Sequence, residues 1–237
     1  MGIGFKQERQ NMLAHTQVLT FHGIGDPAVP VTPAERNYYV PVETYRRTIS
    51  RLSDLEQQFG VSIEVTFDDG NLSDFETGLP ALTEAGRKGR FFVLAGRIDT
   101  DGFLSAGQMR EIVAAGSVIG SHGHDHVDWR NLDEAGFQRE LYDARKKIED
   151  TIGLPVTEAA IPFGALDKNV LHRLKDAGYS RIYTSTPGLA FGGSWFCPRW
   201  SPTASFDPDT DITPRLSMKQ KLRSSLYALA RRGRYRI

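Results

Sequence analysis

Short runs rich in β-branched and aromatic residues alternate along the chain with longer segments in which apolar residues recur every three or four positions. The short runs predict strands at residues 18–21, 63–67, 90–94, 117–120, 158–161 and 181–184. The longer segments predict helices at residues 42–59, 74–85, 105–115, 133–152 and 168–177. This alternation favours an α/β fold in which helices surround a parallel sheet that is either doubly wound or closed as a barrel.

Residues at the ends of the predicted helices are typical helix caps. Ser105 and Asp167 stand where a side-chain oxygen can accept from the first backbone N–H groups. No repeat, low-complexity tract or linker interrupts the chain before about residue 200. We therefore expect one domain over residues 1–211, followed by a tail over residues 212–237.

The predicted tail differs from the rest of the chain in charge. Residues 212–237 hold eight Lys or Arg and no acid, whereas residues 1–211 hold 21 basic and 29 acidic residues, a net charge of −8. Residues 217–232 have helical periodicity, with Leu222, Leu226 and Leu229 on one face. Such a basic amphipathic helix either docks on the acidic body by its leucines or lies on an anionic membrane surface. Nucleic acid is a weaker alternative, because proteins that bind it are more often basic over the whole domain.

Composition narrows the class of protein. The chain has 237 residues, of which 40% are hydrophobic and 24% charged, as in ordinary globular proteins. No stretch approaches the roughly 20 apolar residues of a membrane span. The single cysteine, Cys197, cannot form an internal disulfide and is expected in the core. The first residues lack the apolar segment of a secretory signal, so we expect a cytoplasmic protein, with peripheral contact at the inner face of the membrane as a further expectation.

Ionisable residues follow three of the predicted strands. His22 ends VLTFHG, Asp68 and Asp69 end IEVTFDDG, and His122 ends SVIGSHG. In a β/α barrel the carboxyl ends of the strands carry the active site. His126 follows His122 by four residues, a spacing that lets two imidazoles converge on one ion. Two histidines and one carboxylate leave coordination positions open, as a catalytic zinc site requires.

Each of these residues has a simpler interpretation. DDG is a common turn, and HGHDH alone is compatible with a solvated loop. Their occurrence at the strand ends of one βα chain favours the site. His124 is an alternative ligand to His126, although an exposed loop side chain is the simpler expectation. His172 lies in an amphipathic helix pattern and is expected on the surface.

Together these segments resemble a known family. VTFDDG, then SHGHDH about fifty residues later, then IPFG are similar to three motifs of the polysaccharide deacetylases, the NodB-homology group or carbohydrate esterase family 4. The resemblance extends over roughly residues 16–200. It implies a distorted (β/α) barrel with about six or seven parallel strands. It also implies metal-dependent removal of N- or O-acyl groups from sugars, with one divalent ion, zinc first and cobalt, nickel or manganese as alternatives.

The resemblance assigns roles to individual residues. Asp68 corresponds to the catalytic base, Asp69 to the metal-binding aspartate, and His122 and His126 to the histidine ligands. The backbone N–H of Phe163, after the proline of IPFG, corresponds to the donor of the oxyanion hole, which stabilises the negative charge on the acyl oxygen.

Two departures from the family pattern agree with each other. The arginine that usually opens the third motif and contacts the catalytic aspartate is replaced by Ala160. The late Leu-x-His motif that supplies a general acid is missing. We expect His22 to replace it, because VLTFHGIGD resembles the YHxI-type opening of circularly permuted members and the first and last strands of a barrel are neighbours. Asp26 stands four residues beyond His22, where it either orients the histidine or only forms a GDP turn.

The predicted activity is removal of an N-acyl group, foremost N-acetyl, from an amino sugar in a polysaccharide, oligosaccharide or lipid-linked precursor, as in exopolysaccharide biosynthesis. Trp195, Trp200 and Phe191 are candidates for stacking on sugar rings and equally for a barrel-closing core, and Trp195 and Pro162 are the residues expected to contact the saccharide. Two alternatives remain open. One is an inactive glycan-binding protein on the same barrel, suggested by Ala160, and the other is a metal-dependent phosphoesterase.

Overall fold

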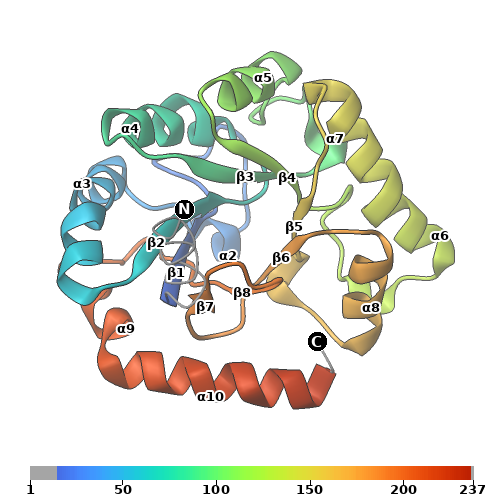
Figure 1. Cartoon of the computed structure of the whole chain (residues 1–237). Coiled ribbons are helices and arrows are strands. Elements are labelled where there is room, and N and C mark those ends of the chain that lie inside the picture. Colours follow the sequence, from blue (N-terminus) through green and yellow to red (C-terminus); the bar gives the residue numbers. More distant parts are fainter. Residues whose placement is uncertain (1–14, 236–237) are drawn as a thin grey trace, which may run out of the picture.

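A computed structural model describes residues 15–235 of the chain. Its centre is a sheet of eight strands in the order β7-β1-β2-β3-β4-β5-β6-β8, surrounded by helices (Figure 1). The residues in which we expected no secretory signal lie largely outside the described part. The strands are β1 (His15–Phe21), β2 (Ser62–Phe67), β3 (Gly89–Val93), β4 (Val118–Ser121), β5 (Glu158–Ala160), β6 (Arg181–Thr184), β7 (Ala190–Phe191) and β8 (Phe196–Pro198).

Seven of the eight strands run parallel, and only the short β7 pairs antiparallel, with β1. The chain leaving β8 nearly closes the sheet into a barrel. Trp200 donates its N–H to the carbonyl of Val18 at 3.0 Å, and Thr20 donates to the carbonyl of Trp200 at 2.9 Å. The predicted distorted (β/α) barrel is therefore confirmed, and six of its strands lie where the hydrophobic pattern predicted them.

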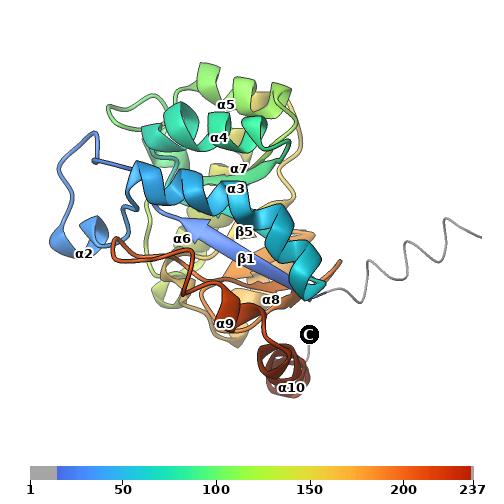
Figure 2. The same ribbon diagram turned by 90° about the vertical axis from the view of Figure 1, so that its left-hand side faces the viewer.

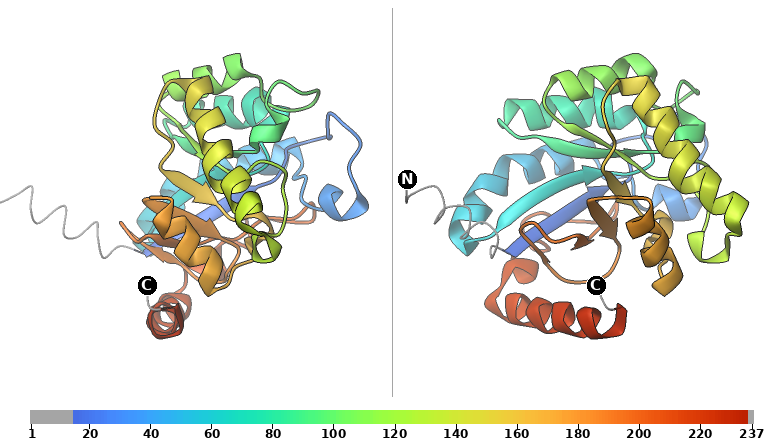
Figure 3. Two further views of the ribbon diagram at one scale, coloured as in Figure 1. Left: turned by 90° about the vertical axis from the view of Figure 1, so that its right-hand side faces the viewer. Right: turned by 45° about the vertical axis from the view of Figure 1, so that its right-hand side comes forward.

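Helices form a ring outside the barrel (Figures 1 and 3). The five expected helical segments are present, two of them with an internal π-helical stretch, η1 or η4. Ser105 and Asp167 cap their helices as predicted, each accepting from a backbone N–H three residues on. The helices are α2 (Pro33–Arg36), α3 (Val42–Phe59), η1 (Asp74–Gly78), α4 (Leu79–Glu84), α5 (Ala106–Ala114), α6 (Glu134–Phe137), η4 (Gln138–Asp143), α7 (Ala144–Ile152), α8 (Lys168–Asp176), α9 (Thr213–Leu216) and α10 (Met218–Tyr235), with 3₁₀ turns at η2 (Ala95–Arg97), η3 (Trp129–Asn131) and η5 (Pro162–Gly164).

The amino-terminal half of the barrel interior is filled by charged side chains. Arg181 on β6 bonds Glu64 on β2 at 3.0 Å, and Arg90 on β3 bonds Glu158 on β5 at 2.8 Å. These strands are not neighbours, so the contacts cross the interior. Cys197 is buried here, as expected, and accepts from Arg181. This end of the barrel is therefore closed, and an open site is left to the carboxyl ends of the strands.

The tail is helical, as predicted, but one of its two expected modes of contact is wrong. The three leucines predicted to share a face do so, yet they point away from the body. The helix docks by its other face instead, where Ser224 is fully buried. Figure 2 shows α10 nearly end-on beside the barrel. The boundary between residues 1–211 and 212–237 stays a prediction. Among residues 15–235, no helix combines the length and apolar character that crossing a membrane demands.

Candidate metal centre and active site

The carboxyl ends of β1, β2 and β4 bring together the predicted residues. Nε2 of His126 lies 3.5 Å from Oδ1 of Asp69, and Nε2 of His122 lies 3.7 Å from the same oxygen. The other aspartate of the pair is close by. Oδ2 of Asp68 is 3.7 Å from Nε2 of His22 and 3.8 Å from Nε2 of His122. Residues from His22 to His126 thus meet because parallel strands end on one side of the sheet.

The donors of Asp69, His122 and His126 fit a divalent metal ion. Their ligand atoms all lie within 4.8 Å of one another. Ligand atoms about 2.1 Å from a tetrahedral ion stand about 3.4 Å apart, close to the two distances measured from Asp69. Oδ1 of Asp69 is buried and accepts no hydrogen bond from the described residues, which is costly unless a cation completes it. Two imidazoles and one carboxylate also leave positions open for water and substrate.

His122 is oriented by a second contact. Its Nδ1 lies 2.9 Å from the backbone carbonyl of Ala160, and its side chain is almost fully buried. Because a carbonyl can only accept, Nδ1 must carry the proton and donate. In the neutral tautomer with the proton on Nδ1, Nε2 is the nitrogen that can bind a metal ion, the arrangement in which a second hydrogen bond orients a ligand histidine.

A buried carboxylate organises the loop between the two histidine ligands. Glu140, on η4, accepts from the backbone N–H of His124 at 2.8 Å, from that of Asp125 at 3.0 Å, and from Nε1 of Trp129 at 3.3 Å. A side chain at Gly123 would meet Oε2 of Glu140 at 2.3 Å, and its φ is +87°, so only glycine fits there. No pattern in the sequence pointed to Glu140, because its partners are two backbone N–H groups and one indole that lie 11 to 16 residues away.

His126, rather than His124, is the second histidine at Asp69. Its backbone has a positive φ of 56°, a conformation that a non-glycine residue adopts at some energetic cost. Burial lowers the pKa of His126 to about 4, so the imidazole is neutral near pH 7, as a metal ligand must be. His124 is turned aside, with Nδ1 2.6 Å from Oδ1 of Asp125.

Asp68 is held by a residue that sequence reasoning missed. Nη1 and Nη2 of Arg199 donate to Oδ1 and Oδ2 of Asp68 at 2.6 and 2.7 Å, and both side chains are nearly fully buried. Burial by itself would raise the pKa of Asp68. The charge of Arg199, supported by His122 and His22, outweighs burial and holds the pKa below its ordinary value. Arg199 thus takes the place of the arginine missing at Ala160. The available signal was CPRW, an arginine at the end of the last strand.

His22 lies at the rim of this group. Burial lowers its pKa, although the charges of Asp68 and Asp69 oppose that effect. The ring of Tyr38 stands 5.3 Å from its ring. Nδ1 of His22 has no partner among the described residues. Asp26 does not orient it, because Asp26 is bonded to Arg36 at 2.6 Å.

The IPFG segment reaches the site, whereas Trp195 does not. Phe163 has φ 57° and lies with its ring 4.4 Å from that of His126, 63% exposed. Pro162 is buried beneath it in the same turn. Trp195 precedes β8 and donates Nε1 to the carbonyl of Tyr179, which precedes β6. It therefore stands at the amino ends of the strands, away from the candidate metal centre, and its contact with the saccharide stays a prediction.

The other predicted aromatic residues support the barrel. Trp200 pairs with β1 through its backbone and stacks under Arg215, 3.6 Å from the ring centroid. Phe191 lies on β7 with its ring 4.9 Å from that of His15. His172 is exposed and paired with Asp176, as expected of a surface residue.

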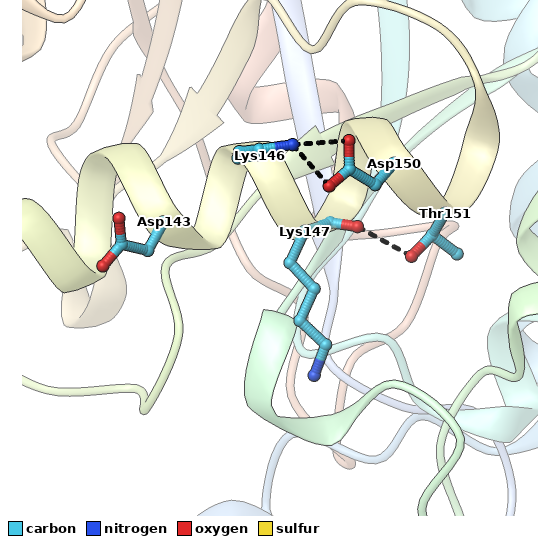
Figure 4. A pocket seen from close by; sticks show the side chains of 5 residues that line it. All are labelled: Asp143, Lys146, Lys147, Asp150 and Thr151. Atoms are coloured by element: carbon cyan, nitrogen blue, oxygen red, sulfur yellow. Dashed lines mark hydrogen bonds and ion pairs between the residues drawn. The ribbon is translucent and has the colours of Figure 1, made fainter.

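A hollow on the surface lies away from these residues. Figure 4 shows its lining, which comes from η4 and α7 alone. Lys146 donates to both carboxylate oxygens of Asp150, at 2.9 and 2.7 Å, and Thr151 donates to the carbonyl of Lys147. These pairs are typical of a solvated helix face, so the hollow has no chemistry of its own.

The sequence of the central part of the chain decides the family. A model of the polysaccharide deacetylase family matches residues 58–182. The chain belongs to the polysaccharide deacetylase family. The match includes both aspartates and both histidines of the candidate metal centre, and it confirms the resemblance drawn from VTFDDG, SHGHDH and IPFG. The circularly permuted subgroup stays a prediction.

Curated relatives of this deacetylase-family chain match about half of its residues. It is 29% identical over 126 residues to the Bacillus subtilis protein YxkH, described by its name as a polysaccharide deacetylase, over 53% of this chain and 45% of that one. It is 28% identical over 126 residues to the chitooligosaccharide deacetylase of Rhizobium leguminosarum bv. trifolii, over 52% of this chain and 56% of that one. The chain thus spans about half the length of the curated relatives it matches.

Solved structures share the fold. A polysaccharide deacetylase from Bacillus cereus superposes with a TM-score of 0.74 at 21% identity, over 86% of this chain and 70% of that one. The Streptococcus pyogenes deacetylase PplD, solved with acetate, superposes with a TM-score of 0.71 at 18% identity, over 85% of this chain and 98% of that one. At such identities the likeness establishes the architecture, an α/β barrel of the deacetylase type.

Proposed function

We propose that this member of the polysaccharide deacetylase family is a metal-dependent hydrolase that removes an N-acyl group, foremost N-acetyl, from an amino sugar in a polysaccharide, oligosaccharide or lipid-linked glycan precursor. One observation carries the proposal. A buried aspartate held by an arginine, Asp68, lies next to three donors that fit one divalent ion, Asp69, His122 and His126. A base beside a metal site is the minimum that amide hydrolysis by water requires.

Asp68 is the proposed general base. A zinc, cobalt, nickel or manganese ion bound at the three donors would polarise the acyl oxygen and acidify a water molecule. Asp68 accepts the proton of the attacking water at Oδ2, the oxygen that faces His22 and His122. Arg199 binds both carboxylate oxygens and so fixes the rotation of the carboxylate. The low pKa of Asp68 keeps it ionised, and ready to accept, throughout the neutral range.

His22 and Phe163 complete the proposed reaction. The carbon–nitrogen bond breaks when the departing nitrogen receives a proton. His22, the imidazole beside Asp68, would take up the proton that Asp68 has accepted from the attacking water and give it to this nitrogen, so that the proton lost by water ends on the amine. The hydrogen bonds within the IPFG turn are donated by Gly164 and Ala165. The N–H of Phe163 is thereby left for the acyl oxygen, where one donor is worth about 3 kcal/mol.

Two exposed aromatic rings suggest where the sugar lies. Phe163 stands beside His126, and Tyr38, 39% exposed, stands beside His22. Rings on two sides of the metal centre are suited to contact with the faces of a saccharide. Pro162 supports this surface from beneath rather than through a large exposed area.

The alternatives lose their support. An inactive glycan-binding protein was favoured by the absent arginine at Ala160, and Arg199 supplies that charge from another strand. A phosphoesterase with two metal ions would need a second cluster of ligands. Residues 15–235 contain only the single cluster of Asp69, His122 and His126.

The proposal extends to the cellular setting. A lipid-linked precursor used in exopolysaccharide assembly would be met at the cytoplasmic face of the membrane, with peripheral contact made by the tail. The excess of eight basic residues in 212–237 supports this setting.

Metal content and hydrolysis, measured together, test the proposal. We expect about one metal ion per wild-type chain and release of acetate from N-acetylglucosamine oligomers. Asp68→Asn should keep the metal and lose turnover, whereas His126→Ala should lose both. His172→Ala, on the surface, is the matched histidine control and should change neither. Full turnover by Asp68→Asn would overturn the assignment of the base.

A further inference from the structure

The outer face of α10 carries an apolar stripe that the fold leaves uncovered. Met218, Leu222, Leu226 and Leu229 follow one another at spacings of four, four and three, which place them on one side of the helix. Each is between 66% and 68% exposed. They are the four most exposed large hydrophobic side chains among the described residues. We call these four residues the outer stripe.

The outer stripe does not pack against the body of this chain, because α10 contacts the body by its opposite face. The hydroxyl of Ser224 is buried, accepts from the backbone N–H of Leu189 at 2.9 Å, and donates to a carbonyl within the helix. Nζ of Lys221 donates to the carbonyl of Phe59 at 2.5 Å. The guanidinium of Arg231 covers the ring of Phe196, 5.0 Å from its centroid.

Figure 1 shows where α10 lies in the molecule. The helix α10 completes the outer ring between α8 and α3, so its outward side is the surface of the molecule. Figure 3 shows the same helix lying along the outside of the barrel in a second orientation. The outward face of its neighbour α3 carries charged residues, for example Arg46 and Arg47.

Charge indicates what covers the stripe. Lys219, Arg223 and Arg234 are exposed on the same helix, and residues 212–237 contain no acid. A second copy packed stripe to stripe would bring two such basic segments together, and the repulsion would oppose pairing. An anionic lipid surface matches the basic groups and at the same time accepts the leucines. Residues 1–211 carry a net charge of −8, so an anionic surface would repel the rest of the body.

We propose that the outer stripe of α10 is an interfacial lipid-binding face, on which Met218, Leu222, Leu226 and Leu229 enter the boundary of an anionic bilayer while the flanking Lys and Arg side chains contact its headgroups. This deepens the membrane setting proposed above by assigning the side chains that make the contact. It does not depend on the deacetylase reaction, since α10 contributes no residue to the metal centre.

Cosedimentation of the full chain with vesicles tests the assignment. Wild type should bind vesicles of phosphatidylcholine with one quarter phosphatidylglycerol at least tenfold more tightly than vesicles of phosphatidylcholine alone, and 0.5 M salt should weaken the binding. Leu226→Gln and Leu229→Gln should each weaken binding roughly tenfold, since each withdraws one leucine from the apolar phase. Leu154→Gln is the matched control, because Leu154 is an exposed leucine that follows α7, across the ring from α10. It should bind like wild type.

Three results would overturn the assignment. The first is wild type that remains in the supernatant with both kinds of vesicle. The second is a double variant Leu226→Gln/Leu229→Gln that binds as tightly as wild type. The third is a dimer, seen by light scattering, that this double variant abolishes. Unchanged melting temperature would show that the variants are folded, as expected for exposed side chains. Unchanged acetate release from soluble oligomers would separate a failure of lipid binding from a failure of the proposed catalysis.

Discussion

Replacement of Arg199 by methionine tests whether the buried ion pair at the site is as strongly coupled as its geometry indicates. Arg199→Met keeps most of the side-chain volume and removes the charge. Asp68 then remains 1% exposed without either of its hydrogen bonds of 2.6 and 2.7 Å. Removal of one partner from such a pair destabilises a protein by about 3–5 kcal/mol. Domains of this kind have roughly 5–15 kcal/mol of stability, so the variant should fold but unfold at much lower urea concentration.

The free energy of unfolding that Arg199→Met loses should depend on pH. In the wild type the pKa of Asp68 is lower in the folded than in the unfolded chain, because Arg199 outweighs burial. Such a group stabilises the fold above the unfolded pKa, near 4, and the benefit disappears as the pH falls through the folded value. In Arg199→Met the largest opposing charge is gone and only His122 and His22 oppose burial, so the pKa of Asp68 should rise above that of the unfolded chain and folding should take up a proton. The difference between the two proteins should therefore be largest near pH 8 and shrink toward pH 4.

Urea unfolding followed by tryptophan fluorescence, in the presence of a chelator, measures the difference. Arg173→Met is the matched control. Arg173 is ion-paired with Glu134 on the surface, where such a pair is worth about 0–1 kcal/mol. In a double-mutant cycle, Arg199→Met and Asp68→Asn should show a coupling of at least about 2 kcal/mol. A loss below about 1 kcal/mol for Arg199→Met at pH 8, or the same loss at both pH values, would refute the reasoning.

Three further predictions concern single groups. Glu140→Gln places an amide donor against N–H donors in the loop that carries His126, so titration should show metal affinity lowered about tenfold; wild-type affinity would contradict the proposed positioning. Asp74 is fully buried, and burial raises its pKa well above the ordinary value. Folding then takes up a proton above pH 4, so the stability of wild type relative to Asp74→Asn should fall as the pH rises from 5 to 7 in melts, by at most about 1.4 kcal/mol per pH unit; parallel curves would refute this. Chelator should lower the melting temperature of wild type but not of His126→Ala, and equal shifts would exclude His126 as a ligand.

Much of the fold was predictable because its signals are local. The strand ending at Phe67 and the helix beginning after Ser105 are set by residues a few positions apart, through alternation, helical spacing and caps. The convergence of Asp69 with His122 was also predictable, since strands of a parallel sheet end on the same side. Sequence reasoning therefore placed the candidate metal ligands without knowledge of any contact.

Other features had no local signal. β8 has only three residues, too few for a periodic pattern, and Arg199 follows it. The ion pair between Arg199 and Asp68 joins residues 131 positions apart, and only the closure of the barrel brings them together. In the sequence, Trp195 belongs to the aromatic segment that also contains Trp200. The direction of β8 places Trp195 at the amino ends of the strands, opposite the candidate metal centre.

The tail shows most clearly which features could not be predicted from the sequence. Periodicity determined that Leu222, Leu226 and Leu229 share one side of a helix, because a helix repeats every 3.6 residues whatever surrounds it. It did not determine which side meets the protein. The side that meets the protein depends on hydrogen-bonding groups of the barrel. Ser224 accepts from the N–H of Leu189 and Lys221 donates to the carbonyl of Phe59, and only tertiary packing places these two groups beside α10. Local spacing fixes which residues lie together, whereas their environment is a property of the whole fold.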